Sequence, residues 1–205
     1  MIFPGSGLYA ITQTDGKSNE QVIEAVHSAL KGGASVIQYR DKVPSDALYL
    51  AKELLVLCRH HQTPLIINDD ADFALQIGAD GVHIGKDDVG IAAARKVLGS
   101  KAIIGLSCYD NIDTALQAQA NGVNYVAFGR FFPSSSKPLA APAQIETLQQ
   151  ARKQINIPIV AIGGILPENG RQLLNAGADI LAVIGGVFDH APEQSSQAYL
   201  KLFNS

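Results

Sequence analysis

The chain has 205 residues, of which 47% are hydrophobic and 17% are charged, and its formal net charge is −3. This length can bury one sizeable core, and the slightly acidic balance argues against a nucleic-acid partner. Two cysteines make no disulfide framework, which favours a cytoplasmic protein. We expect no signal peptide and no membrane partner, because the first residues lack a basic, then apolar pattern and no apolar run approaches about 20 residues.

Apolar, β-branched runs alternate with helical patterns along the whole chain. The expected strands are 8–12, 35–39, 64–67, 81–84, 102–106, 124–128, 158–162 and 180–183. The expected helices are 19–31, 45–60, 70–77, 90–98, 111–120, 143–154 and 167–176, followed by one that ends near Phe203. The strands look continuously apolar, as parallel strands covered on both faces do. The pattern predicts an α/β fold, a single-domain (β/α)8 TIM barrel over residues 1–205.

A weak internal repeat supports the barrel. Segments 32–35, 78–81, 121–124 and 177–180 each separate a helix from the second, fourth, sixth and eighth strands, as repeated modules would. The alternative is an open, doubly wound sheet. We disfavour it because the first strand–helix turn lacks a G-x-G-x-x-G fingerprint.

The stretch 129–138, GRFFPSSSKP, follows the expected sixth strand. Its hydroxyls and backbone N–H groups can donate to phosphate oxygens, and Arg130 and Lys137 add positive charge. The alternative is a solvated turn, which Ser and Pro also favour. This stretch alone does not separate the two interpretations, and Arg130 is given no role.

Charged residues follow several strands, where the active sites of such barrels lie. Gln38 and Arg40 are two positions apart and so point the same way on a strand, with Lys42 continuing the direction. Together with Lys137 they could cradle an anion, unless these cations are simply solvated.

Acidic residues follow the third and fourth strands, which are neighbours in a barrel. Asp69 and Asp88 could therefore face one Mg²⁺ ion, which proteins hold with one or two carboxylates and substrate phosphates. Each could instead cap the next helix, although Asp70 and Asp87 are better placed to do so. No Cys or His cluster has zinc spacing.

Glycine pairs 163–164 and 185–186 follow the last two strands, where barrels often bind phosphate through backbone N–H groups. The three groups together predict a Mg²⁺-assisted enzyme acting on two phosphorylated small molecules. His83 lies within the fourth strand and is either a hydrogen-bonded core residue or a substrate contact. Cys108 has no evident base partner, so we expect it to be structural.

Six motifs carry a family resemblance: QYRDK (38–42), IND (67–69), GADGVHIG (78–85) with Asp88, GLS (105–107), FPSSSKP (132–138) and AIGGI (161–165). In this order they resemble the thiamine-phosphate synthase family from residue 8 to about 188. The resemblance implies that 4-amino-2-methyl-5-pyrimidinylmethyl diphosphate is joined to 4-methyl-5-(2-phosphoethyl)thiazole. The products are thiamine phosphate and diphosphate, and the substitution is dissociative, through a pyrimidine-methyl cation.

The resemblance also assigns residues. It implies one Mg²⁺ ion held by Asp69 and Asp88, with Arg40, Lys42 and Lys137 as the catalytic cations. It implies contacts to the pyrimidine diphosphate from Gln38, Tyr39, Arg40, Asp41, Lys42, Asn68, Ser107 and Lys137. It implies contacts to the thiazole phosphate from Ser134, Ser135, Ser136, Gly164, Ile184 and Gly185. The family usually has Ser where Gly185 stands and Glu where Asp41 stands, and usually has Thr rather than Ser in its Thr-x-Thr-Lys loop.

Three other functions are compatible with such a barrel. A thiazole tautomerase typically has His where Lys137 stands and lacks the full set of cations and carboxylates. A phosphosugar isomerase or indole-pathway barrel does not need paired Mg²⁺ carboxylates. A non-catalytic barrel that senses thiamine precursors would bind both ligands without turnover. The sequence leaves a homo-oligomer open.

Overall fold

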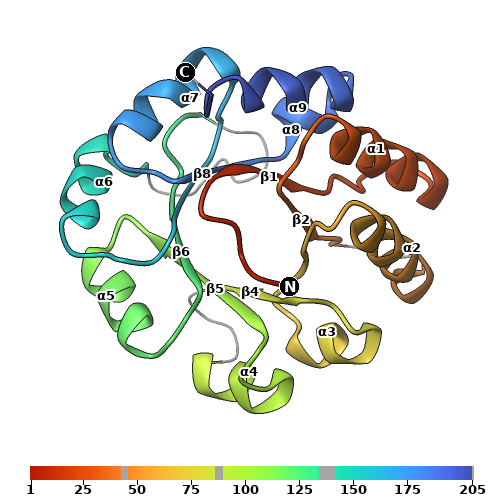
Figure 1. Ribbon diagram of the computed structural model, residues 1–205, viewed down its shortest axis with the longest axis horizontal. Helices are drawn as coiled ribbons and strands as arrows, with labels where there is room; N and C mark the ends of the chain where they lie inside the picture. The colour runs from red at the N-terminus through yellow and green to blue at the C-terminus, as the bar shows by residue number, and fades with distance from the viewer. Residues whose placement is uncertain (43–45, 86–89, 134–141, 205) are drawn as a thin grey trace.

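The computed structural model describes residues 1–42, 46–85, 90–133 and 142–204 (Figure 1). Eight parallel strands form its centre: β1 Gly7–Ile11, β2 Val36–Tyr39, β3 Leu65–Asn68, β4 Gly81–Ile84, β5 Ile103–Tyr109, β6 Tyr125–Gly129, β7 Ile159–Ile162 and β8 Ile180–Val183. Each pairs with the next, and β1 also pairs with β8, with Leu8 opposite Leu181. The sheet is a closed barrel, which confirms the predicted fold and excludes the open sheet.

Helices surround the barrel as an outer ring (Figure 1). They are α1 Asn19–Lys31, α2 Ala47–His60, α3 Ala71–Ile77, α4 Ile91–Leu98, α5 Ile112–Ala120, α6 Ile145–Arg152, α7 Pro167–Asn175, α8 Gly185–Phe188 and α9 Pro192–Leu200. The glycine pair 185–186, expected in a loop, instead begins the short α8. No helix among the described residues is long and apolar enough to cross a membrane.

Three strands end later than the sequence indicated: β3, β5 and, by one residue, β6. β5 continues to Tyr109 because its pairing with β6 persists through Ser107 and Ala127 before the register shifts. β3 includes Asn68, which pairs with His83 of β4. Ser107 and Asn68 therefore lie within strands rather than after them, so the barrel wall fixes their backbone positions.

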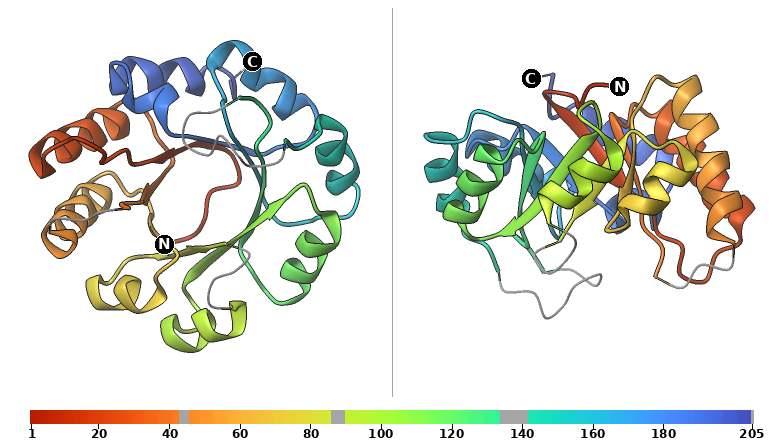
Figure 2. Two further views of the ribbon diagram at one scale, coloured as in Figure 1. Left: turned by 180° about the vertical axis from the view of Figure 1, so that it is seen from behind. Right: turned by 90° about the horizontal axis from the view of Figure 1, so that it is seen from below.

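The strands alternate, although their sequences look uniformly apolar. One set of side chains packs against the helices, while the other forms a separate cluster inside the barrel. The inner cluster contains Phe3, Tyr9, Ile11, Val36, Ile66, Ile103, Tyr125, Ala127, Val160, Ile180 and Ala182. Phe3 stacks on Tyr125 with ring centroids 4.0 Å apart. The N-terminal segment thus closes one end of the interior (Figures 1 and 2).

The repeated segments 78–81 and 177–180 perform the same structural task. The Asp80 carboxylate accepts a hydrogen bond from the Leu65 N–H at 3.0 Å. It also forms an ion pair with Arg59 of α2, with an N–O distance of 2.6 Å. The carboxylate therefore ties a helix to the first residue of the preceding strand. Because the Asp80 side chain is almost fully buried, the Leu65 N–H depends on it for a partner.

The same arrangement recurs further around the barrel. Asp179 accepts from the Ile159 N–H at 2.7 Å and pairs with Arg152 of α6 at 2.8 Å. Asn124 accepts from the Ile104 N–H at 2.9 Å and from the Arg95 guanidinium of α4 at 3.3 Å. We call these three acceptor sites the helix–strand clamps. They lie at the amino ends of the strands, and both termini of the chain lie at that end of the molecule (Figure 2).

The clamp at Asp80 should contribute to stability and not to chemistry. Asp80→Ala leaves a buried N–H unpaired, so we expect the free energy of unfolding to fall by roughly 2–3 kcal/mol. Urea denaturation measures this. Glu24→Ala is the control, because it removes an exposed carboxylate from α1 and should leave the midpoint unchanged. Equal midpoints for the two variants would contradict the structural role of the clamp.

Candidate active site

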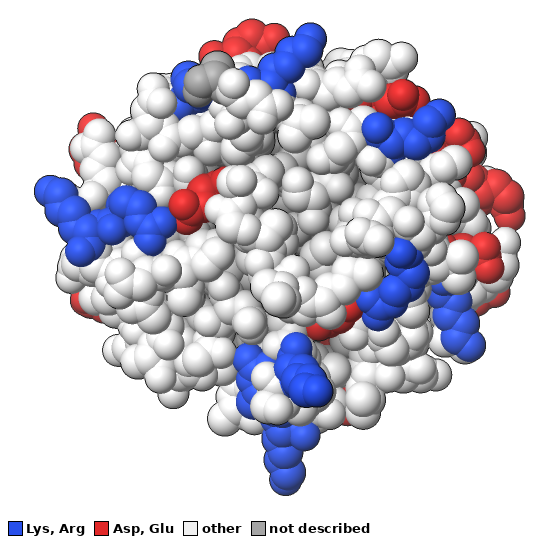
Figure 3. All heavy atoms as spheres, in the orientation of Figure 1, with Lys and Arg blue, Asp and Glu red and all other residues white. Residues whose placement is uncertain are grey.

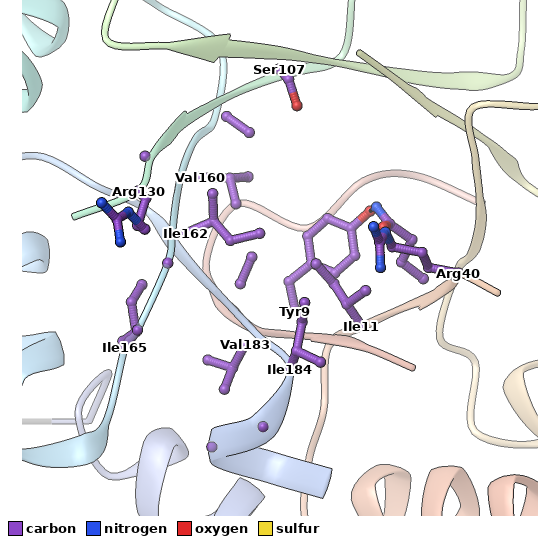
Figure 4. Close-up of a pocket in the computed structure, with 18 of the residues that line it drawn as sticks. Tyr9, Ile11, Arg40, Ser107, Arg130, Val160, Ile162, Ile165, Val183 and Ile184 are labelled. Carbon is purple, nitrogen blue, oxygen red and sulfur yellow. Dashed lines mark hydrogen bonds between the residues drawn. The ribbon is translucent and has the colours of Figure 1, made fainter. Parts of the chain in front are cut away.

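A cavity of about 500 Å³ opens at the carboxyl ends of the strands. Ser107, Arg40 and Arg130 approach it from different sides, with aliphatic residues such as Val160 and Ile162 between them (Figure 4). Among the residues that the sequence nominated, those that line it are Gln38, Arg40, Asn68, Asp69, Ser107, Gly164, Ile184 and Gly185. The amino end carries its charges mainly around the rim (Figure 3).

The remaining predicted site residues fall into three groups: those outside the described ranges, Lys42 at a smaller cavity, and the pair Tyr39 and Asp41. Lys137, Asp88 and Ser134, Ser135 and Ser136 lie outside the described residues, so their predicted roles stay predictions. Lys42 is exposed and lines a smaller cavity of about 210 Å³, together with Arg40. Arg40 lines both cavities.

Tyr39 lies on the other face of β2. It is buried among the helices, near Phe73, and its hydroxyl donates to Asp41 at 3.3 Å. Neither Tyr39 nor Asp41 lines the large cavity, because alternate residues of a strand point to opposite faces. Their contact with a substrate stays a prediction, and the structure gives Tyr39 a packing role.

Arg40 is held at its backbone by Thr12, which the sequence analysis missed. The Thr12 hydroxyl accepts from the Arg40 N–H at 2.9 Å and donates to the Arg40 carbonyl at 3.0 Å. Thr12 is only 2% exposed, so this pair of bonds joins the ends of β1 and β2 in a protected place. The sequence offers no signal for this role, because Thr12 stands inside the expected strand 8–12 and looks like an ordinary strand residue.

Asp69 and Asp70 are adjacent but serve different purposes. The Asp70 carboxylate accepts from the Phe73 N–H at 2.8 Å and caps α3, as expected. Asp69 does not cap the helix: it has a φ of 65°, lines the cavity and accepts from the Asn68 amide. Left-handed backbone is uncommon for residues other than glycine, although Asp and Asn adopt it most readily.

Of the two predicted Mg²⁺ ligands, Asp69 lies within the described residues and Asp88 lies outside them. In the part of the chain that the structure describes, no three His, Cys, Asp or Glu side chains gather as a metal site. Asp69 nevertheless presents the hard carboxylate oxygen that Mg²⁺ prefers, at the wall of a cavity large enough for substrate phosphates. The residue present fits the ion.

Glycines at the end of β7 allow another segment to approach closely. The Phe132 N–H donates to the Gly163 carbonyl at 3.0 Å, so the chain beyond β6 runs beside the chain beyond β7. A side chain at Gly164 would collide with the Pro133 carbonyl oxygen, and its φ is 63°. Arg130 packs against Gly163, and its buried Nε has no hydrogen-bond partner among the described residues.

A hydrogen-bonded series of side chains crosses the floor of the cavity. Gln38 Nε2 donates to the Tyr9 hydroxyl at 2.8 Å, and the Tyr9 and Tyr125 hydroxyls are 2.9 Å apart. His83 Nδ1 lies 2.9 Å from the Tyr125 hydroxyl, and its Nε2 lies 2.9 Å from the Ser107 hydroxyl. His83 thus belongs to a polar network and also lines the cavity.

Burial controls the ionisation of several groups here. It raises the pKa of Tyr9 and that of Tyr125 well above the usual value, so both hydroxyls stay neutral. It also raises the pKa of the Cys108 thiol to about 12. Cys108 lies in the outer core cluster rather than in the cavity lining, which agrees with its predicted structural role.

Comparison with known proteins decides the family. The family described as thiamine monophosphate synthase matches residues 8–187. The chain belongs to this family. It is 53% identical over 184 residues to a thiamine-phosphate synthase of Nitrosococcus oceani, covering 89% of this chain and 85% of that protein. It is 51% identical over 191 residues to one of Methylococcus capsulatus, covering 92% and 85%.

Solved structures agree with this assignment. The thiamine phosphate pyrophosphorylase from Pyrococcus furiosus has a TM-score of 0.86 and 33% identity, covering 97% of this chain and 95% of that one. An orotidine 5'-phosphate decarboxylase from Pyrococcus horikoshii, with 15% identity and a TM-score of 0.68, shares the fold alone. Membership of the family makes the chain an enzyme of the transferase class.

The raised tyrosine pKa values predict a dependence of stability on alkaline pH. Below about pH 10, the usual tyrosine pKa, both states are protonated and the stabilisation is fully present. Above it the unfolded chain loses protons that the folded chain keeps, so the free energy of unfolding falls. Tyr9→Phe should show a shallower fall between pH 9 and 11 in urea denaturation. Parallel pH profiles for wild type and variant would contradict this expectation.

Proposed function

We propose that this chain is a thiamine-phosphate synthase that joins 4-amino-2-methyl-5-pyrimidinylmethyl diphosphate to 4-methyl-5-(2-phosphoethyl)thiazole. The observation that carries the proposal is that a single cavity is lined by Arg40, Asn68, Asp69 and Ser107 from β2 to β5, and by Gly164 and Gly185 beyond β7 and β8. Two anions can therefore lie against different walls of one space. Family membership supports the same activity.

The diphosphate would lie on the side of β2 to β5. The Arg40 guanidinium offers two parallel donors to phosphate oxygens, and its backbone is already fixed by Thr12. Asn68 and Ser107 add neutral donors. Lys42 and Lys137 complete the proposed cation set, with Lys42 at the adjoining smaller cavity.

A magnesium ion would belong to the same side. We propose that Asp69 and Asp88 hold it. When bound, it would neutralise charge on the leaving diphosphate. Two features orient the Asp69 carboxylate before any ligand binds: the left-handed backbone of Asp69 and the hydrogen bond that the Asn68 amide donates to it.

The reaction breaks the bond between the pyrimidine methylene carbon and the diphosphate oxygen. The electron pair of that bond leaves with the diphosphate, and the lone pair of the thiazole nitrogen forms the new carbon–nitrogen bond. The positive charge of the pyrimidine-methyl cation passes to the thiazolium ring, so no proton has to be removed. The chain's own contribution is to hold both partners in line and to neutralise the leaving group.

The thiazole phosphate would lie against β7 and β8. Gly164 and Gly185 bring backbone N–H groups close to the cavity, because neither carries a side chain that would intervene. Ser134, Ser135 and Ser136 are the proposed hydroxyl donors. The described segment before them pairs with β7, because the Phe132 N–H donates to the Gly163 carbonyl.

One assay tests the activity. The protein, mixed with both phosphorylated substrates and Mg²⁺, should form thiamine phosphate and release one diphosphate per product. Binding of both substrates without product would overturn the proposal in favour of a sensor. Conversion of the thiazole carboxylate tautomer, without any carbon–nitrogen bond formation, would favour the tautomerase.

Asp69 and its neighbour Asp70 form a matched pair for testing the metal side. Asn tolerates the backbone of Asp69 and can also cap α3 in place of Asp70. Asp69→Asn should lower kcat by roughly a hundredfold or more and raise the Mg²⁺ concentration needed for half-maximal rate. Asp70→Asn should stay within about twofold of wild type, as it keeps the cap. Equal losses in the two variants would remove Asp69 from the metal side.

Arg40→Lys tests whether geometry matters beyond charge. Lysine keeps the charge but cannot offer two parallel donors. We expect the KM for the pyrimidine diphosphate to rise roughly tenfold while the KM for the thiazole phosphate stays within about twofold, both from steady-state kinetics. A rise confined to the thiazole phosphate would place Arg40 on the other side of the site.

A further inference from the structure

The side-chain network on the cavity floor connects two walls of the site. Gln38 of β2 and Ser107 of β5 are its ends, and Tyr9, Tyr125 and His83 are its interior members. Each of the four links is 2.8 or 2.9 Å long. Tyr9 and Tyr125 are at most 1% exposed and Gln38 is 2% exposed. Water therefore has little access to the link between the two tyrosine hydroxyls.

Counting protons gives the network a direction. Each tyrosine hydroxyl has one proton to donate. Tyr9 accepts from Gln38 Nε2, so its own proton is available for the Tyr125 oxygen. Tyr125 then donates to His83 Nδ1. With Gln38 Nε2 facing Tyr9, the opposite order at either tyrosine would leave a buried hydroxyl proton without an acceptor, which is costly.

The direction continues through the imidazole. A neutral histidine has one nitrogen that accepts and one that donates. If Nδ1 accepts from Tyr125, then Nε2 carries the proton and donates to the Ser107 oxygen. The Ser107 hydroxyl keeps its own proton for another acceptor. Ser107 lines the cavity, so that acceptor can be a bound ligand.

The ends of the network then present opposite chemistry to the substrate. Gln38 has committed one amide N–H to Tyr9, which fixes the amide and leaves its carbonyl oxygen as an acceptor. Ser107 is left as a donor. We propose that Tyr9, Tyr125 and His83 are positioning residues whose directed hydrogen bonds set Gln38 as an acceptor for the pyrimidine amino group and Ser107 as a donor to the diphosphate. This inference rests on the proposed function for the identity of the ligand.

The surroundings of Tyr125 keep the network in one arrangement. The Phe3 ring stacks on the Tyr125 ring. The His83 ring also stacks on the Tyr125 ring, with ring centroids 5.6 Å apart. A side chain at Gly105 would collide with the Tyr125 ring. The hydroxyl therefore has little freedom to leave the line between Tyr9 and His83. Burial raises the pKa of both tyrosines, so neither loses the proton that the direction requires.

The first test reads the proton on His83 directly, in ligand-free protein. With ¹⁵N-labelled histidine at pH 8, NMR should show His83 as a neutral ring protonated at Nε2, its signals being assigned by their loss in His83→Gln. A ring protonated at Nδ1, or at both nitrogens, would overturn the proposal. This measurement depends neither on turnover nor on any substrate, so it fails or succeeds separately from the proposed function.

The second test removes one link and keeps the ring. Tyr125→Phe preserves the stacking but deletes the donor to Nδ1, so the His83 tautomers should become mixed. Tyr199→Phe is the matched control for this reading: Tyr199 is also buried, but its hydroxyl donates to the Ile165 carbonyl, outside the network. An unchanged His83 tautomer in Tyr125→Phe, or an equal change in Tyr199→Phe, would overturn the proposal.

A double-mutant cycle tests the consequence for the substrate. Tyr125→Phe and Ser107→Ala should each lower kcat/KM for the pyrimidine diphosphate about tenfold, with the KM for the thiazole phosphate within about twofold. The double variant should resemble the worse single one, because Tyr125 acts through Ser107. Independent losses that multiply would mean that Tyr125 has only a structural role. Turnover that is normal in both single variants would also reject the positioning role while leaving the synthase assignment intact.

Discussion

Closure of the sheet through β1 and β8 is the constraint on which the rest of the molecule depends. Once eight parallel strands close, every second side chain must point into one narrow interior. At the amino end, Phe3, Val36 and Ile180 fill that interior. At the carboxyl end the same strands carry Gln38, Ser107 and other polar residues. The apolar plug and the polar site are successive layers of one stack of side chains.

Much of this arrangement could be predicted from the sequence. The apolar runs and the glycines that end the helices predicted the barrel. The two-residue spacing of Gln38 and Arg40 predicted that both side chains lie on one face of a strand. Asp70 was the better candidate for the helix cap, and it is the cap. These predictions succeeded because each depends on a local pattern, either strand alternation or helix capping, that survives in any context.

Other parts of the site could not be predicted, because they depend on register between strands. Tyr9 and Tyr125 are far apart in sequence and look like ordinary strand residues, yet their hydroxyls meet across the barrel. β5 extends past Ser107 only because β6 continues to pair with it. The start of α8 could not be predicted either, because two adjacent glycines are typical of a loop and not of the first residues of a helix.

The helix–strand clamps add a separation of duties between the two ends of the barrel. Asp80, Asn124 and Asp179 secure helices to strands at the amino end, far along each strand from the residues that line the cavity. Substitutions among the residues that line the cavity can therefore accumulate without breaking the hydrogen bonds and ion pairs of the helix–strand clamps. A scaffold built this way can explore new substrates by altering one rim, since the opposite rim independently preserves its architecture.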